Sequence, residues 1–235
     1  MQAGGYPDGA VTLREATVRY GSRTALEGVS GTFAAGSLTA VVGANGAGKS
    51  TLLGAIAGSV PLAAGRIDCP ARAARRMAYL PQLAALDRDY PITVAELIAL
   101  GGWRGFGAFR APSPALRARA AEAARAVGLS DRAGRRIAAL SAGELQRALF
   151  ARLMLQDAAL ILLDEPFAPV DAATSATLLG RIDAWHAEGR TVIAVLHDLD
   201  LVRERFPETL VLARRCLAWG KTAAALPAMA VGAAA

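Results

Sequence analysis

The residues best suited to phosphate chemistry lie in the segment GANGAGKS, residues 43–50. The segment fits the pattern G-x-x-x-x-G-K-[ST], and it follows a short apolar stretch that is typical of a strand. Glycines in such a loop let successive backbone N–H groups turn inward at the start of a helix, where they form a cradle for anions. Lys49 can then reach the outer phosphates of a nucleoside triphosphate, and the hydroxyl of Ser50 can ligate Mg²⁺.

The lysine at this position is unusual for the chain. Of 26 basic residues only two are lysines, Lys49 and Lys221, and the remaining 24 are arginines. An ammonium group is a compact point charge, whereas a guanidinium is a wide planar fork that does not fit the same cradle. We infer that phosphate geometry keeps the lysine at position 49.

A second candidate is the acidic pair Asp164 and Glu165, which ends the apolar run LILL. A continuous apolar run predicts a strand buried on both faces, and open α/β sheets bind ligands at the carboxyl ends of such strands. Asp164 would hold Mg²⁺ through water, and Glu165 would orient or deprotonate the attacking water. Two solvated carboxylates at a strand exit are the plain alternative, but the upstream glycine loop favours the functional interpretation.

A third motif, LSAGE, covers residues 140–144 and precedes the acidic pair. Ser141 and Glu144 have the spacing of a capping box. The motif therefore predicts a helix N-terminus, with free N–H groups and the positive end of the helix dipole. An ordinary capped helix without a ligand is the alternative.

Together, in the chain order glycine loop, LSAGE and acidic pair, the three motifs resemble those of ATP-binding-cassette (ABC) ATPases, and the resemblance covers residues 11–220. It implies an ATP-hydrolysing transporter subunit with ATP and Mg²⁺ as cofactors. It also implies three overlapping sets of site residues. The catalytic set is Glu165, His197 and Lys49. The ATP-binding set is Tyr20, Gly43, Asn45, Gly46, Gly48, Lys49, Ser50, Thr51, Gln82, Ser141, Gly143, Glu144 and Asp171. The Mg²⁺ set is Ser50, Gln82 and Asp164.

The resemblance also assigns individual roles. Tyr20 would stack on adenine, and Gln82 would meet Mg²⁺, the attacking water and a transmembrane partner. Asp171 matches the D-loop, and His197 matches the switch histidine that contacts the γ-phosphate. In this family the LSAGE-type helix end closes over ATP held by a second subunit, so a head-to-tail homodimer with two ATP molecules is expected.

Three positions depart from the family pattern. Ala142 replaces a glycine, which would be costly if the backbone there had positive φ or approached phosphate closely. Glu144 replaces a glutamine; it keeps the capping role and adds negative charge near the nucleotide. Pro169 lacks a backbone N–H. We expect turnover to survive these changes at a modest rate.

The expected fold class is α/β: a P-loop NTPase (RecA-like) core with an N-terminal antiparallel β region and an inserted α-helical subdomain. A helix is expected over residues 49–57, ended by Gly58, and another over 113–129. After residue 158 strands and helices alternate, which is typical of a parallel sheet. Expected strands are 13–21, 25–33, 38–43, 76–82, 160–166, 191–197 and 208–214, and later expected helices are 172–189 and 199–206.

The chain is expected to form a single ABC ATPase domain over residues 1–235. Residues 1–82 and 156–222 would form the nucleotide-binding core with the antiparallel β region, and 83–155 the helical subdomain. Thr93 and Glu96 have capping-box spacing before one of its helices. Within the subdomain, 101–112 is Gly- and aromatic-rich and is expected to be a loop, while 223–235 is a low-complexity, poorly packed tail.

Composition limits the class of protein. The 235 residues are 54% hydrophobic, yet no run approaches the roughly 18 apolar residues of a membrane span. The net charge is +6, but the arginines are spread along the chain rather than gathered in a tail, and we expect no nucleic-acid partner. The lone cysteines Cys69 and Cys216 indicate a reducing compartment. Composition thus gives no membrane-spanning run, and the ABC resemblance implies a peripheral subunit on the cytoplasmic face of a bacterial inner (plasma) membrane.

Segments 101–113, 165–174 and 195–207 are similar to the zinc/manganese branch of bacterial uptake systems. That resemblance implies transmembrane permease subunits and, indirectly, a periplasmic or extracellular solute-binding protein. Alternatives are an iron-chelate or haem uptake ATPase, a soluble ABC ATPase acting on ribosomes or DNA, and a nucleotide-binding regulatory module without turnover. The last is disfavoured by the presence of Glu165 and His197.

Overall fold

The computed structural model describes residues 6–82, 88–105 and 111–229. The chain divides into two compact units. The first contains Met1–Tyr79, Ala158–Glu165 and Ala184–Ala235, and the second contains Leu80–Asp157 and Pro166–Asp183. Residues 166–183, which we grouped with the core from sequence, thus belong to the unit that contains the helical segment.

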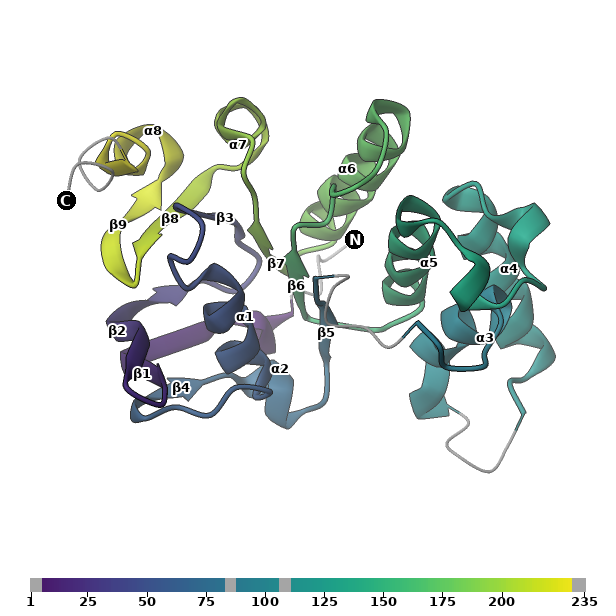
Figure 1. Cartoon of the computed structure of the whole chain (residues 1–235), viewed down its shortest axis with the longest axis horizontal. Helices are drawn as coiled ribbons and strands as arrows, with labels where there is room; N and C mark the ends of the chain where they lie inside the picture. Colours follow the sequence, from purple (N-terminus) through teal and green to yellow (C-terminus); the bar gives the residue numbers. More distant parts are fainter. Residues whose placement is uncertain (1–5, 83–87, 106–110, 230–235) are drawn as a thin grey trace. The chain divides into compact units, whose positions relative to one another are not determined.

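The larger sheet has six strands in the order β5-β6-β7-β3-β8-β9 (Figure 1). The strands β6, β7, β3 and β8 are parallel, and β9 is antiparallel to β8. The bounds are β3 Leu38–Val42, β5 Met77–Leu80, β6 Leu160–Asp164, β7 Thr191–Val195, β8 Glu208–Ala213 and β9 Arg215–Lys221. Every residue of β3, β6 and β7 is buried, as their continuous apolar sequences predict. The predicted α/β class is confirmed.

A second, three-stranded sheet has the order β2-β1-β4 and is antiparallel throughout. Its strands are β1 Val11–Tyr20, β2 Arg23–Phe33 and β4 Ala64–Asp68. The predicted N-terminal antiparallel region is therefore present, but β4 was missed, as was β9 in the larger sheet. β4 is almost entirely exposed and carries no apolar alternation, so pairing with β1 rather than its own pattern makes it a strand.

The helix α1, Lys49–Ala57, provides much of the core of the first unit. Its residues Leu52, Leu53 and Ile56 are fully buried, in a cluster that includes side chains of both sheets. Gly58 ends the helix with φ 81°, in the left-handed conformation that glycine adopts without strain. The predicted helix over 49–57 is confirmed. Short elements complete the unit: η1 Pro7–Gly9, α2 Pro70–Ala73, α7 Leu199–Arg205 and α8 Thr222–Ala225.

The prediction of a poorly packed tail is wrong at its start. Thr222 begins α8, donates a hydrogen bond to the carbonyl of Phe206 and shares one with Thr209 at 2.9 Å. Ala225 and Leu226 are buried as well. Small alanines allow α8 to pack closely on β8 and β9, which the low-complexity composition did not indicate. Residues 230–235 of the tail lie outside the described residues.

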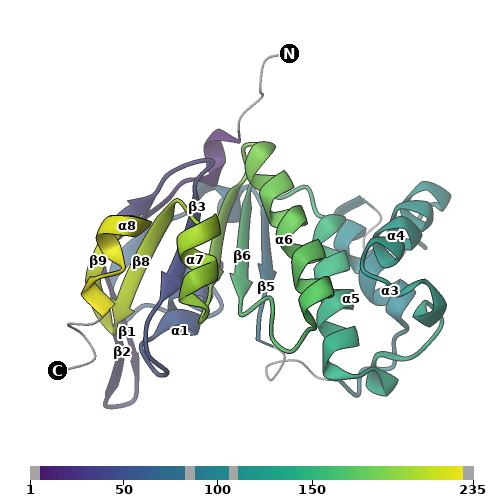
Figure 2. The same ribbon diagram turned by 90° about the horizontal axis from the view of Figure 1, so that it is seen from above.

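The second unit is built mainly from helices, with α3, α4 and α5 packed on one another (Figure 2). The bounds are α3 Val94–Ala99, η3 Leu100–Gly105, α4 Pro114–Ala126, η4 Ser130–Arg132, η5 Ile137–Ala139 and α5 Ala142–Met154. The helix α6, Ala172–Ala187, begins in this unit and ends in the first. The predicted capping box of Thr93 and Glu96 starts α3, and Ser113 caps α4.

The expectation of a loop over 101–112 is only partly met. Residues Leu100–Gly105 form a 3-10 helix directly after α3. Gly101 is buried, and a Cβ there would lie 2.1 Å from the carbonyl oxygen of Arg152. This close backbone contact explains the glycine better than the conformational freedom of a loop does. Residues 106–110 lie outside the described part of the chain.

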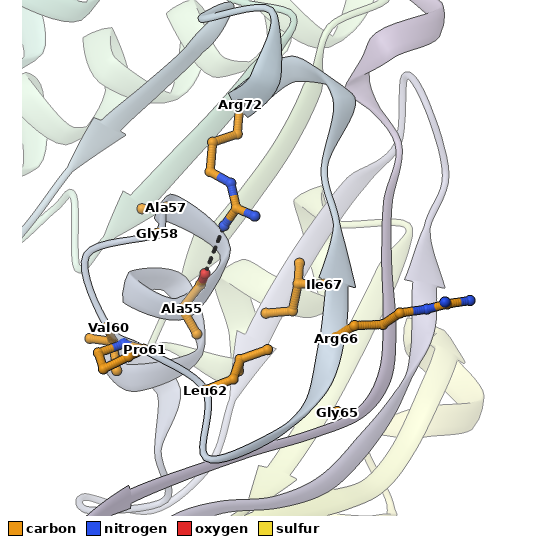
Figure 3. A pocket seen from close by; sticks show the side chains of 10 residues that line it. All are labelled: Ala55, Ala57, Gly58, Val60, Pro61, Leu62, Gly65, Arg66, Ile67 and Arg72. Atoms are coloured by element: carbon orange, nitrogen blue, oxygen red, sulfur yellow. Dashed lines mark hydrogen bonds between the residues drawn. The ribbon is translucent and has the colours of Figure 1, made fainter.

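Arg72 closes the C-terminal end of α1. Its Nη1 donates to the carbonyl oxygens of Ala55 at 3.2 Å and Ile56 at 3.0 Å. Figure 3 shows the bond to Ala55, at a pocket of about 590 Å³ that Arg66 also lines. The carbonyls of the last helical turn have no partner within the helix, and a cation there also complements the helix dipole. Arg72 therefore anchors the helix whose other end carries the glycine loop.

We predict that Arg72→Met lowers the free energy of unfolding by about 1–2 kcal/mol, because two charge-assisted hydrogen bonds are lost. Urea denaturation followed by circular dichroism measures the change. Arg66→Met is the matched control: Arg66 lines the same pocket but is exposed, and its replacement should change stability by less than about 0.5 kcal/mol. Equal effects of the two variants would contradict the anchoring role.

Candidate active site

The glycine loop leaves β3 and enters α1, as the sequence predicts. Gly43 has φ 156°, and a Cβ there would lie 2.2 Å from the carbonyl oxygen of Leu212. Gly48 has φ 95°, and its Cβ would lie 2.5 Å from the carbonyl oxygen of Ala25. No side chain caps the first turn of α1. Its N–H groups are therefore available to an anion.

Backbone contacts hold the loop in place. The N–H of Arg214 donates to the carbonyl oxygen of Ala47 at 2.8 Å, and the N–H of Ala47 donates to that of Ala44 at 3.1 Å. The carbonyl of Arg214 in turn accepts from the N–H of Glu27. The end of β8 and the strand β2 thus fix a loop that has few side chains of its own.

Lys49 is 6% exposed, and its ammonium group points back to the loop. Nζ donates to the carbonyl oxygens of Gly43 at 2.8 Å and Ala44 at 3.0 Å. Burial lowers the pKa of Lys49, while the charges of Glu165 and Asp164 act in the opposite direction. The loop carbonyls therefore stabilise a cation that phosphate oxygens would satisfy more strongly.

Asp164 ends β6 and is 1% exposed. Its Oδ1 accepts a hydrogen bond from Oγ of Ser50 at 3.1 Å. Burial raises the pKa of Asp164 to about 6, although the hydrogen bond from Ser50 lowers it. A hydroxyl and a carboxylate are the hard oxygen ligands that Mg²⁺ takes, and a bound cation would favour the ionised carboxylate. These two residues therefore fit a Mg²⁺ ion.

Glu165 and His197 form a close pair. His197 Nε2 lies 2.7 Å from Oε1 of Glu165, and both side chains are partly exposed. Glu165 adopts φ 52°, in the left-handed region, which is costly for a residue with a Cβ. This conformation ends the extended backbone of β6 at Asp164, and the side chain of Glu165 contacts His197.

Tyr20 and Arg23 lie at the rim of the loop. Tyr20 ends β1, is 53% exposed and pairs with Arg23 across the hairpin. Nη2 of Arg23 lies 3.7 Å from the position of a Cβ on Gly46, so it is a second cation beside the loop. Sequence reasoning missed Arg23, because only the pairing of β1 with β2 reveals its proximity. Asn45 is exposed in the same loop, and Thr51 follows in α1.

The second unit contains the LSAGE motif at the start of α5, where the predicted capping box is confirmed. Oγ of Ser141 accepts from the N–H of Glu144 at 3.2 Å, and Oε2 of Glu144 accepts from the N–H of Ser141 at 2.8 Å. Ala142 is the first helical residue and does not have positive φ, so replacing glycine with alanine there carries no backbone strain. A Cβ on Gly143 would lie 2.9 Å from the carbonyl oxygen of Pro169.

Glu144 has a further partner that sequence reasoning missed. Nε of Arg132 donates to Oε1 of Glu144 at 3.1 Å. The hydrogen bond from the Ser141 backbone, followed by that from Arg132, lowers the pKa of Glu144 to about 2. The carboxylate is therefore charged and paired.

Asp171 and Gln82 also belong to the second unit. Both carboxylate oxygens of Asp171 bind Thr174, accepting from its N–H at 2.9 Å and from its hydroxyl at 2.8 Å. These bonds lower the pKa of Asp171. They give Asp171 a capping role at the start of α6. Gln82 follows β5 by two residues and is partly buried.

The predicted site residues therefore form two groups. The first group lies together in the first unit and consists of Lys49, Ser50, Asp164, Glu165 and His197. Tyr20 and the glycines of the loop, residues 43, 46 and 48, belong to the same unit. Gln82, Ser141, Gly143, Glu144 and Asp171 lie in the second. Each group has its own internal hydrogen bonds.

Comparisons with known proteins agree with this geometry. The sequence profile of the ABC transporter family matches residues 26–168. The zinc transport system ATP-binding protein of Treponema pallidum is 39% identical over 92% of this chain and 83% of its own length. The chain belongs to the ABC transporter ATP-binding family. A manganese transport system ATP-binding protein of Bacillus subtilis is 36% identical over 90% of this chain and 86% of its own.

Solved structures agree on the fold of this ABC ATPase. The structure of an ATP-binding subunit of an ABC transporter superposes with a TM-score of 0.81 at 24% identity, over 96% of this chain and 99% of that one. The family profile and the relatives at 36–39% identity show that the chain is an ATP-binding subunit of the ABC transporter type with an ATPase domain. Within the described residues, no helix has the length and apolar character needed to cross a membrane.

The glycine loop gives a matched pair of variants. Gly46→Ala and Gly48→Ala both place a Cβ on a residue with positive φ, but only at Gly48 does the new atom meet backbone, 2.5 Å from the Ala25 carbonyl. We predict that Gly46→Ala costs about 1–2 kcal/mol of unfolding free energy, and that Gly48→Ala costs several kcal/mol. Denaturant unfolding of the nucleotide-free protein measures both. Similar losses would show that conformation alone, and not the close approach, requires Gly48.

Proposed function

We propose that two copies of this ABC ATPase bind two ATP molecules head to tail, and that closing and hydrolysis drive a permease for zinc or manganese. The observation that carries the hydrolytic part is the cluster of Lys49, Ser50, Asp164, Glu165 and His197 beside an uncapped helix start. The metal substrate is supported by the names of the relatives at 36–39% identity, which are zinc and manganese transport proteins.

At the nucleotide, the first unit supplies binding and chemistry. The N–H groups of the glycine loop and α1 receive the phosphates, and Lys49 exchanges its loop carbonyls for phosphate oxygens. Ser50, Asp164 and, in the proposed closed state, Gln82 would hold Mg²⁺. When bound, this ion supplies charge stabilisation at the β- and γ-phosphates. Tyr20 would stack on the adenine.

Glu165 would orient the attacking water and accept its proton. The 2.7 Å contact with His197 positions the carboxylate, and the Glu165 side chain is 27% exposed, so water can reach it. His197 would also contact the γ-phosphate and so link the water-orienting group to the phosphoryl group that the water attacks, with ADP as the leaving group. The geometry thus supports water attack on the γ-phosphate, with a positioned base and a bound counter-cation.

The second unit would complete the site of the other copy. The start of α5, with Ser141, Gly143 and Glu144, offers N–H groups to the γ-phosphate of ATP on the partner. Asp171 would lie at the dimer interface. The chain as a whole would act as one ABC ATPase domain, placed against permease subunits at the cytoplasmic face of the membrane, with a solute-binding protein delivering the metal.

Hydrolysis is tested by removing the base. We predict that Glu165→Gln lowers the rate of ATP hydrolysis by about 100-fold or more while Mg-ATP binding remains, because the amide cannot accept a proton. Phosphate release and size-exclusion chromatography with Mg-ATP measure turnover and dimer formation. The matched control is Glu204→Gln in α7, an exposed glutamate that should retain turnover. Turnover by Glu165→Gln at the normal rate, or failure of that variant to dimerise with its permease present, would contradict the proposal.

The transported ion is tested in the organism. We predict that deletion of the gene slows growth under zinc or manganese starvation, and that added metal restores it. The gene for the native chain should complement the deletion, whereas the gene for Glu165→Gln should not, because transport depends on hydrolysis. A defect that appears only when iron chelates or haem are limiting would instead favour the alternative substrate class, and normal growth in both metal-starved media would overturn the zinc/manganese assignment.

A further inference from the structure

The carboxylate of Glu144 uses its two oxygens for two different segments. Oε2 accepts from the N–H of Ser141 and closes the capping box, at 2.8 Å. Oε1 accepts from Nε of Arg132, at 3.1 Å, and Arg132 ends the short segment η4, outside α5. The capping box is therefore complete without Arg132, and the arginine adds charge rather than a missing hydrogen bond for the helix.

That charge matters because of where Glu144 lies. A glutamine could make the same cap without a charge, whereas the hydrogen bonds to Glu144 hold its pKa near 2 and keep it ionised. A bare carboxylate at a helix start offsets the positive end of the helix dipole, which is the feature that attracts anions. The Arg132 side chain is 38% exposed and the Glu144 side chain 19%, so the pair borders solvent beside the proposed phosphate-binding helix end.

We propose that Arg132 is a positioning residue for ATP: it neutralises Glu144 and so lets the start of α5 accept the γ-phosphate of ATP held by the second copy of the chain. This inference rests on the head-to-tail dimer of the proposed function. It explains how the chain tolerates a glutamate in a motif whose task is to meet a polyphosphate.

A purely structural role for the ion pair predicts a different result. Partly exposed ion pairs contribute little to folding, and both bonds of the capping box remain when Arg132 is replaced. Loss of the arginine should therefore leave stability almost unchanged and should weaken the interaction with ATP. Moreover, the weakening should depend on the charge of residue 144, which a structural role would not require.

The experiment is a double-mutant cycle in the full-length protein with its permease. Arg132→Met is compared with the native chain, and Arg132→Met is compared again in a Glu144→Gln background. The readouts are the Mg-ATP concentration for half-maximal ATPase activity, kcat and the thermal unfolding midpoint. Arg135→Met is the matched control, because it removes the same charge from an exposed arginine three residues further along the chain, after η4.

We expect Arg132→Met to raise the half-saturating Mg-ATP concentration about tenfold, the effect of one unpaired charge beside a polyphosphate at a partly exposed site. The unfolding midpoint should not move, and kcat should change less than the half-saturating concentration. In the Glu144→Gln background the same substitution should have almost no effect. Arg135→Met should behave as the native chain.

Two results would overturn the inference: an unchanged ATP dependence in Arg132→Met, or an equal loss in the two backgrounds. ATP-dependent dimerisation, measured in Glu165→Gln protein with its permease and with native Arg132 and Glu144, separates this from failure of the proposed function. If that protein dimerises and Arg132→Met has no effect, the inference alone fails. If that protein does not dimerise, the head-to-tail proposal fails and takes the inference with it.

Discussion

The site depends on one constraint: a buried ammonium and a buried carboxylate must both remain charged close to one another. Lys49 is 6% exposed and Asp164 is 1% exposed, and burial acts against the charged form of each, lowering one pKa and raising the other. Loop carbonyls and the Ser50 hydroxyl compensate in part. Nucleotide phosphates and a cation would complete the compensation, so this pair of residues has the electrostatics of a site for a charged ligand with its counter-ion.

The parallel sheet is what brings these groups together. β3, β6 and β7 run in the same direction, so the glycine loop, the acidic pair and His197 all follow carboxyl ends at one edge. The strands can be buried on both faces because they carry no polar residues before their ends, apart from Thr39 and Thr191, whose hydroxyls have hydrogen-bond partners. Chemistry is therefore confined to the positions where each strand stops.

Local signals explain how much of this was predictable. The loop and α1 could be predicted because Gly48, Lys49 and Gly58 have fixed conformational or chemical roles. The capping box of Ser141 and Glu144 likewise depends on a spacing within one turn. By contrast, β4 and β9 acquire their structure from pairing partners: β4 is almost entirely exposed, and the short apolar run 216–219 of β9 is only partly buried and shows no alternation.

The features that could not be predicted from the sequence depend on contacts between residues far apart in the chain. Arg132 is twelve residues from Glu144, and Arg23 is 23 residues from Gly46 of the glycine loop, so neither contact follows from spacing. Residues 223–225 of α8 were assigned to a poorly packed tail because alanine-rich composition says little about packing. The buried hydroxyl of Thr222 at the start of the helix, with its hydrogen-bond partners, holds the helix in place. Side-chain identity predicted the chemistry of this chain, and the pairing of distant segments determined which charges are balanced.

The residues of this site also lower the stability of the folded chain. Because the pKa of Asp164 rises from 3.8 to about 6, its ionised form is disfavoured in the folded chain, and the cost grows as pH rises from about 4 to 6 and is complete above that range. It is on the order of 2–3 kcal/mol, and the left-handed conformation of Glu165 adds to it. Mg-ATP would bind only the folded chain and relieve the first cost, so ligand binding and folding stability are coupled through Asp164. If the folded chain stabilised the ionised form of Asp164 without a ligand, Mg-ATP binding would stabilise the fold by a smaller free energy.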